Sequence, residues 1–180
     1  YETDSDDIAP AHLITATNVS SAEANEYLSL IAESDAAFSQ LVEYFSQQKE
    51  KTVICMFGDH NPKFSDDDFY DSLYAQTPGL TEEEKQFNLY TTPFVIWANY
   101  DIKEQSDLNI SANYLGGLLL QTAGIPGNAY FNYLDALREE YPVVTSNGYE
   151  DKEGNVYQWS GQMDEFADYR TLQYKYLFAN

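Results

Sequence analysis

Cysteine, histidine and basic residues are scarce in this chain, and each scarcity excludes a class of protein. The 180 residues include one cysteine, two histidines and nine lysines and arginines, against 30 aspartates and glutamates. A single cysteine excludes a disulfide within the chain. The formal net charge of -21 would repel the phosphates of nucleic acids, so we expect no nucleic-acid partner.

Long apolar runs are also missing. No stretch reaches the roughly 18 consecutive apolar residues that a membrane-spanning helix needs, and no basic-then-apolar leader is present. We therefore expect any anchor or export signal to lie outside this chain. The content of 43% hydrophobic and 16% aromatic residues nevertheless favours a folded domain over disorder.

Helical and strand patterns alternate along the first half of the chain, which is typical of an α/β fold. A long amphipathic helix is predicted over residues 21–48, with Ser20 and Glu23 at the spacing of a capping box and Ile31 and Leu41 in its inner stripe. Two short apolar runs then predict buried strands, at residues 52–57 and 93–98.

The second half predicts shorter elements. They are a helix begun by Thr81, helices over 111–124, 128–140 and 164–177, and a hairpin over 150–157. We expect one domain over residues 1–180, with an α/β part over 1–142 and a small strand-and-helix tail over 143–180.

Asp59 and His60 are the candidate metal ligands. They follow Gly58 directly at the end of the first apolar run. In open parallel sheets ligands bind beyond the carboxyl ends of the strands, so we expect both side chains at the working edge of the fold. A carboxylate oxygen and an imidazole nitrogen suit manganese or zinc. An isolated Asp-His pair is more often a simple strand-end turn.

Three ordered segments carry a resemblance to a known family. They are Gly58-Asp59-His60-Asn61-Pro62, residues 90–101 and residues 111–115. This series resembles the carboxyl-terminal half of the lipoteichoic acid synthase-like sulfatase family, within the alkaline phosphatase superfamily. The resemblance spans roughly Tyr1 to Leu177 and implies a fragment of a three-layer sandwich, with a central sheet flanked by helices.

The resemblance implies a phosphoglycerol transferase at the extracellular face of the bacterial cell membrane. Such enzymes use a threonine nucleophile and a divalent cation, usually manganese, with magnesium, calcium or zinc as alternatives. Asp59 and His60 match the family's metal-binding Asp-His pair. The implied partners are an anionic glycerophospholipid headgroup, a polyglycerolphosphate acceptor and the upstream part of the same catalytic domain.

The family's other site residues have no match in this sequence. The nucleophilic threonine, a metal-binding glutamate and a substrate-binding histidine are all expected upstream of Tyr1, and His12 is better interpreted as a structural histidine. With two protein ligands alone, we expect this chain by itself to be inactive and to bind metal weakly.

Several other interpretations stay open. A sulfatase or a phosphoethanolamine transferase could use the same scaffold. Sixteen tyrosines and two tryptophans could instead build a non-catalytic surface for carbohydrate or protein. Among the acidic residues, Asp35 suggests a structural role. Residues 66–68 fail the calcium-loop pattern because Asp71 stands where glycine is needed.

The metal hypothesis predicts the effect of removing either ligand. In the complete protein, Asp59→Ala or His60→Ala should abolish metal-dependent turnover and leave the fold largely intact, because both side chains are expected at the sheet edge. Turnover assays and circular dichroism of each variant check this, and full activity in either variant would refute the assignment.

Overall fold

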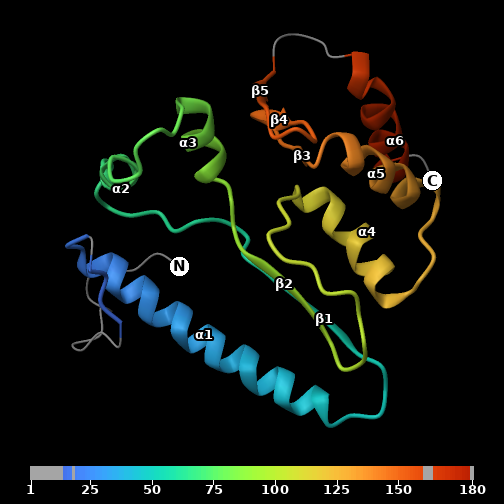
Figure 1. Ribbon diagram of the computed structural model, residues 1–180, viewed down its shortest axis with the longest axis horizontal. Coiled ribbons are helices and arrows are strands. Elements are labelled where there is room, and N and C mark those ends of the chain that lie inside the picture. The colour runs from blue at the N-terminus through green and yellow to red at the C-terminus, as the bar shows by residue number, and fades with distance from the viewer. Residues whose placement is uncertain (1–13, 18, 160–163, 179–180) are drawn as a thin grey trace. The chain divides into compact units, whose positions relative to one another are not determined.

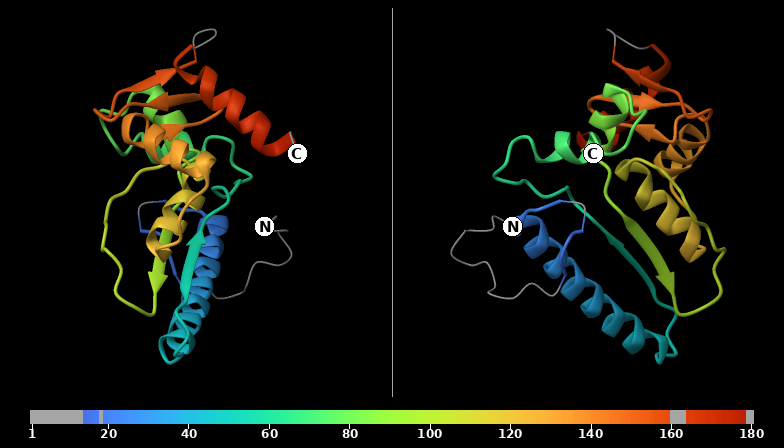
Figure 2. Two further views of the ribbon diagram at one scale, coloured as in Figure 1. Left: turned by 90° about the vertical axis from the view of Figure 1, so that its right-hand side faces the viewer. Right: turned by 60° about the vertical axis from the view of Figure 1, so that its left-hand side comes forward.

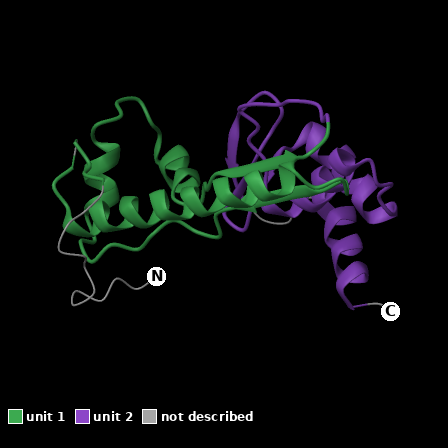
Figure 3. Ribbon diagram, turned by 90° about the horizontal axis from the view of Figure 1, so that it is seen from below, with its two compact units in different colours: residues 1–100 green, residues 101–180 purple. Residues whose placement is uncertain are grey.

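The computed structural model describes residues 14–17, 19–159 and 164–178, and the chain divides into two compact units. Unit 1 comprises residues 1–100 and unit 2 residues 101–180 (Figure 3). His12 lies outside the described residues. The expectation of a single domain, with a tail from residue 143, stays a prediction.

The predicted long helix is present in unit 1 as α1 (Ala22–Ser46) (Figure 1). Its N-cap is Ser21 rather than Ser20: the Ser21 hydroxyl accepts a hydrogen bond from the N–H of Ala24 at 3.1 Å. The predicted capping box is therefore wrong. The predicted inner stripe is also wrong in part, because Ile31 and Leu41 are exposed.

The two predicted strands are present, and they pair with each other. Strands β1 (Val53–Phe57) and β2 (Phe94–Ala98) run side by side in opposite directions (Figure 2). In this antiparallel ladder Val53 lies opposite Ala98 and Phe57 opposite Phe94. The parallel arrangement assumed for the sheet edge is therefore wrong for this pair. The strands are also less buried than predicted, since Met56 is 40% and Phe57 57% exposed.

Hydrogen bonds at both ends hold this antiparallel register. At one end the N–H of Gly58 donates to the carbonyl of Pro93 at 2.9 Å. At the other end the N–H of Asn99 donates to the carbonyl of Thr52 at 3.1 Å, and the N–H of Thr52 donates to Asn99 Oδ1 at 2.9 Å. Residues 58–93, which connect the two strands, therefore leave and re-enter the ladder at the same end.

The returning segment carries two short helices, α2 (Phe69–Tyr74) and α3 (Glu82–Asn88). Helix α3 has the predicted start: Thr81 and Glu84 form a capping box, with hydrogen bonds of 2.7 and 3.2 Å. The core of unit 1 lies between α1 and α2, where the tilted rings of Phe64 and Phe69 pack with centroids 4.0 Å apart and form a buried cluster with Ala24.

Unit 2 packs helices around a buried tyrosine and leucine. Helices α4 (Ala112–Ala123) and α5 (Ala129–Glu140) follow the predicted boundaries closely, and α4 ends at Gly124 in the left-handed conformation. Tyr114 and Leu134 are almost fully enclosed. The Tyr114 hydroxyl donates to the carbonyl of Tyr141 at 2.9 Å, and burial raises its pKa.

A three-stranded antiparallel sheet and a last helix complete unit 2. The strands are β3 (Val143–Val144), β4 (Gly148–Glu150) and β5 (Val156–Gln158), and the short 3-10 helix η1 (Asp164–Phe166) leads into α6 (Ala167–Phe178). The predicted hairpin corresponds to β4 and β5. The α/β class is thus confirmed, as two small sheets with helices. No helix in the described part has the length and apolar character to cross a membrane.

The enclosed leucine of unit 2 makes its core testable. Leu134 is 1% exposed, so Leu134→Ala should lower the free energy of unfolding by about 2–5 kcal/mol through lost burial and a cavity. Leu177→Ala is the matched control, because Leu177 is 59% exposed and its loss should change stability by less than about 0.5 kcal/mol. Urea unfolding followed by circular dichroism measures both, and equal effects would contradict this core.

Candidate metal-binding site

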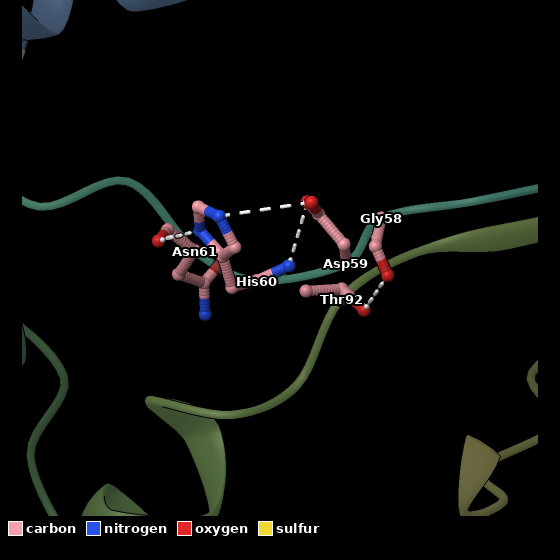
Figure 4. Close-up of polar contacts among 5 residues, drawn as sticks. All are labelled: Gly58, Asp59, His60, Asn61 and Thr92. Atoms are coloured by element: carbon pink, nitrogen blue, oxygen red, sulfur yellow. Dashed lines mark hydrogen bonds and ion pairs between the residues drawn. The ribbon is translucent and has the colours of Figure 1, made fainter. Parts of the chain in front are cut away.

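The ligand turn, residues 58–62, begins where β1 ends (Figure 4). The Gly58 carbonyl accepts a hydrogen bond from the Thr92 hydroxyl at 2.8 Å, while its N–H is bonded to Pro93. A Cβ atom at Gly58 would lie 2.9 Å from the Cβ of Thr92. Glycine therefore allows the two chain segments to approach this closely, and the turn leaves the ladder at a fixed point.

The Asp59 carboxylate faces His60 Nε2, while His60 Nδ1 faces the Asn61 carbonyl (Figure 4). Asp59 Oδ1 accepts a hydrogen bond from the main-chain N–H of His60 at 2.9 Å, and Oδ2 lies 3.7 Å from His60 Nε2. The two side chains are 84% and 68% exposed. Both predicted ligands are thus brought together, on an open surface.

The chemistry of this pair fits a cation. His60 Nδ1 lies 2.9 Å from the carbonyl oxygen of Asn61. Because a carbonyl only accepts hydrogen bonds, this contact requires a hydrogen on Nδ1, and a neutral ring of that form has its lone pair on Nε2. A carboxylate oxygen and this nitrogen then face each other as two electron-pair donors, which suits a divalent metal ion.

Two donors are only part of a metal site. Structural and catalytic zinc sites, for example, take at least three protein ligands. Within the described residues, no group of three or more His, Cys, Asp or Glu side chains could hold a metal ion. The acidic side chains at 66–68 are exposed and do not join the pair, and Asp35 is exposed on α1. The donor set therefore fits half of a site.

Contacts that the sequence did not reveal fasten the residues after the ligand turn. The hydroxyl of Tyr70 donates to the carbonyl of Pro62 at 2.6 Å, and Phe64 is buried in the core of unit 1. The N–H of Ser65 donates to Glu23 Oε2 at 2.9 Å, and hydrogen bonds from Ser65 lower the pKa of Glu23. Lys63, between these anchors, is exposed.

Comparison with known proteins identifies a protein family whose sequence model matches this chain. The sequence model described as Sulfatase matches residues 2–125. Over 161 residues the chain is 26% identical to the "Putative cyclic beta-1,2-glucan modification protein" of Rhizobium meliloti (strain 1021). The match covers 85% of this chain and 25% of that protein, so the chain spans about a quarter of its relative. No solved structure matches.

The close approach at Gly58 predicts a stability effect. Gly58→Ala should lower the free energy of unfolding by about 1–3 kcal/mol, because the new methyl group meets the Thr92 side chain. In a Thr92→Gly background the same substitution should cost less, since the contacted atoms are gone. Urea unfolding of the four proteins gives the coupling, and an unchanged cost would show that the contact does not constrain the turn.

Proposed function

Because this chain belongs to the sulfatase family, within the alkaline phosphatase superfamily, we propose that it is the carboxyl-terminal part of a metal-dependent phosphoglycerol transferase of the bacterial cell envelope. The proposed enzyme is of the lipoteichoic acid synthase type and acts at the extracellular face of the membrane. The observation that carries the proposal is the pair of donors, Asp59 Oδ2 and His60 Nε2, 3.7 Å apart after β1.

In this proposal Asp59 and His60 hold a divalent cation, with manganese as the first choice. The remaining ligands, a glutamate and the threonine nucleophile, come from the upstream part of the same catalytic domain. The bound cation supplies Lewis acidity that lowers the pKa of the threonine hydroxyl and neutralises charge on the phosphoryl oxygens. The threonine oxygen, losing its proton, would attack the phosphorus of a glycerophospholipid, and the P–O bond to diacylglycerol would break as that oxygen takes up a proton. An acceptor hydroxyl would then attack the same phosphorus, lose its proton and displace the threonine oxygen, which is reprotonated.

The exposed apolar side chains of the β1–β2 ladder support the idea that another part of the catalytic domain covers them. All ten residues of the two strands are apolar, a pattern typical of strands buried on both faces. Yet Met56, Phe57 and Val95 are exposed, and within the described part each strand pairs only with the other. We assign this surface to the upstream residues of the domain, which would also bring the missing ligands.

The Rhizobium relative supports group transfer rather than hydrolysis. Its name refers to modification of a cyclic glucan, and we take this to favour transfer of a group to a sugar. Sulfate ester hydrolysis is the second candidate, because the family itself is named for it. The nucleophile separates the two: formylglycine indicates a sulfatase, and an unmodified threonine indicates transfer of a phosphorus group.

Calorimetric titration with manganese tests the split site. We expect tight binding by a protein extended upstream to include the candidate threonine and glutamate, and weak or undetectable binding by the present 180 residues. The binding should disappear with His60→Ala in the extended protein, because Nε2 is a proposed ligand.

Lys63→Ala is the matched control, because this exposed side chain belongs to the neighbouring loop but is not a proposed ligand. It should bind manganese like the unmodified extended protein. Absence of binding in the extended protein, or binding that survives His60→Ala, would refute the proposal and favour a non-catalytic interaction module.

A further inference from the structure

We propose that the carboxyl end of α6, together with the start of α5, is a surface that seats unit 2 on an anionic phospholipid membrane. This apolar tip consists of Tyr130, Tyr174, Tyr176, Leu177 and Phe178. The juxtaposition that carries the inference is the stacking of Tyr176 on Tyr130 beside exposed apolar side chains. The inference rests on the proposed function, which places the protein at the membrane, and it names the surface that makes contact there.

The last turn of α6 exposes large apolar side chains. Tyr174 is 65%, Leu177 59% and Phe178 70% exposed. Residues one and two positions apart do not face the same side of a helix, so the apolar residues of 174–178 lie on several sides of this turn. A single stripe would suit packing against one neighbouring helix, whereas apolar side chains on several sides are typical of a helix that is surrounded.

Ring contacts fix the apolar tip to the body of unit 2. The rings of Tyr130 and Tyr176 stack with centroids 4.2 Å apart and planes at 9°, and Phe131 meets Tyr176 at 6.1 Å. Tyr174 packs against Phe178 at 5.2 Å. Figure 1 shows the end of α6 beside the start of α5. Because these side chains are already held in place, binding through them loses less conformational entropy.

Acidic residues are missing from the sequence segments that form the tip. The chain has 30 acidic residues, yet residues 108–134 contain no charged side chain, and Arg170 and Lys175 are the charged residues of 169–178. The flanking carboxylates, Asp168 and Asp135, lie more than one helical turn along α6 and α5 from the tip residues of the same helix. Arg170 and Lys175 are exposed, so α6 brings positive charge next to the apolar side chains.

This combination of groups fits a phospholipid surface. A tyrosine ring has an apolar body and a polar hydroxyl, which suits the boundary between acyl chains and headgroups. Lysine and arginine lay their stems along apolar surface and direct their charge to lipid phosphates. No helix in the described part of the chain could cross a membrane, and the contact we infer is accordingly a shallow one at the membrane surface.

The strong acidity of the chain determines the orientation of this contact. A net charge of -21 repels anionic lipid, but at physiological salt the repulsion is screened over about 8 Å. A surface rich in carboxylates therefore stays away from the headgroups, and a surface without them can approach. We expect unit 2 to meet the lipid through the apolar tip and in one orientation.

The apolar tip also differs from the exposed surface of the β1–β2 ladder. The ladder lies within residues 2–125, which the family model matches, and the residues of the tip follow that range. We therefore assign the two apolar surfaces to different partners: the ladder to the upstream residues of the domain, and the tip to lipid.

Vesicle flotation of the 180-residue chain tests the inference. Protein bound to vesicles rises with the lipid, whereas self-associated protein sinks. With vesicles of equal parts phosphatidylcholine and phosphatidylglycerol at physiological salt, we expect the chain to float. Leu177→Ser combined with Phe178→Ser should weaken the binding at least about tenfold, because burial of one large apolar side chain contributes about a factor of ten or more.

Leu41→Ser combined with Tyr44→Ser is the matched control. It removes an exposed leucine and an exposed aromatic ring from another helix, α1, and should float like the unmodified chain. Lys175→Glu should weaken binding to the mixed vesicles more than binding to phosphatidylcholine alone, because it reverses a charge beside the lipid phosphates. A merely structural effect would weaken both equally.

The outcomes separate this inference from the proposed function. Absence of flotation by the unmodified chain, or equal loss in the two double variants, would overturn it, and the first of these results needs no substitution. Absence of flotation, with self-association that disappears in the 177/178 variant, would show that a second copy covers the tip. Manganese binding is measured without lipid, so flotation without it in the extended protein would refute the proposed function alone.

Discussion

The antiparallel pairing of β1 with β2 is the constraint on which unit 1 depends. It fixes Gly58 against Thr92 at one end and Thr52 against Asn99 at the other. Residues 58–93 must begin and end at the same end of the ladder. The ligand turn and the end of α3 therefore become neighbours. The Asp59–His60 pair owes its position to this closure, because both residues follow directly after the closed end of the ladder.

At each end of the ladder, an asparagine side chain donates hydrogen bonds to main-chain carbonyls at the end of a helix. Asn99 Nδ2 donates to the carbonyls of Phe45, Gln48 and Glu50, and thereby attaches the carboxyl end of α1 to β2. Asn61 Nδ2 donates in the same way to three carbonyls within residues 88–91, at the end of α3. Main-chain carbonyls at helix ends need donors, and amide side chains supply them without adding charge to a chain that is already strongly acidic.

Local signals in the sequence predicted most elements, and long-range contacts account for the errors. The Thr81–Glu84 capping box, the stop at Gly124 and the hairpin predicted over 150–157 depend on residues a few positions apart, and all three are present. The antiparallel pairing and the exposure of Ile31 depend on segments far apart in the chain. Periodicity shows which side of a helix is apolar, but not whether anything covers it.

The Asp59–His60 pair stood out in the sequence by its residue types and position, whereas the contacts of Asn61 and Thr92 gave no signal because their partners lie about 30 positions away. The free edges of the β1–β2 ladder have a further consequence. Among the residues that the structure describes, no third strand pairs with these edges, and their N–H and C=O groups beside exposed apolar side chains are a template for strand addition between molecules. In concentrated solution, this same surface would promote self-association and aggregation of the 180-residue chain.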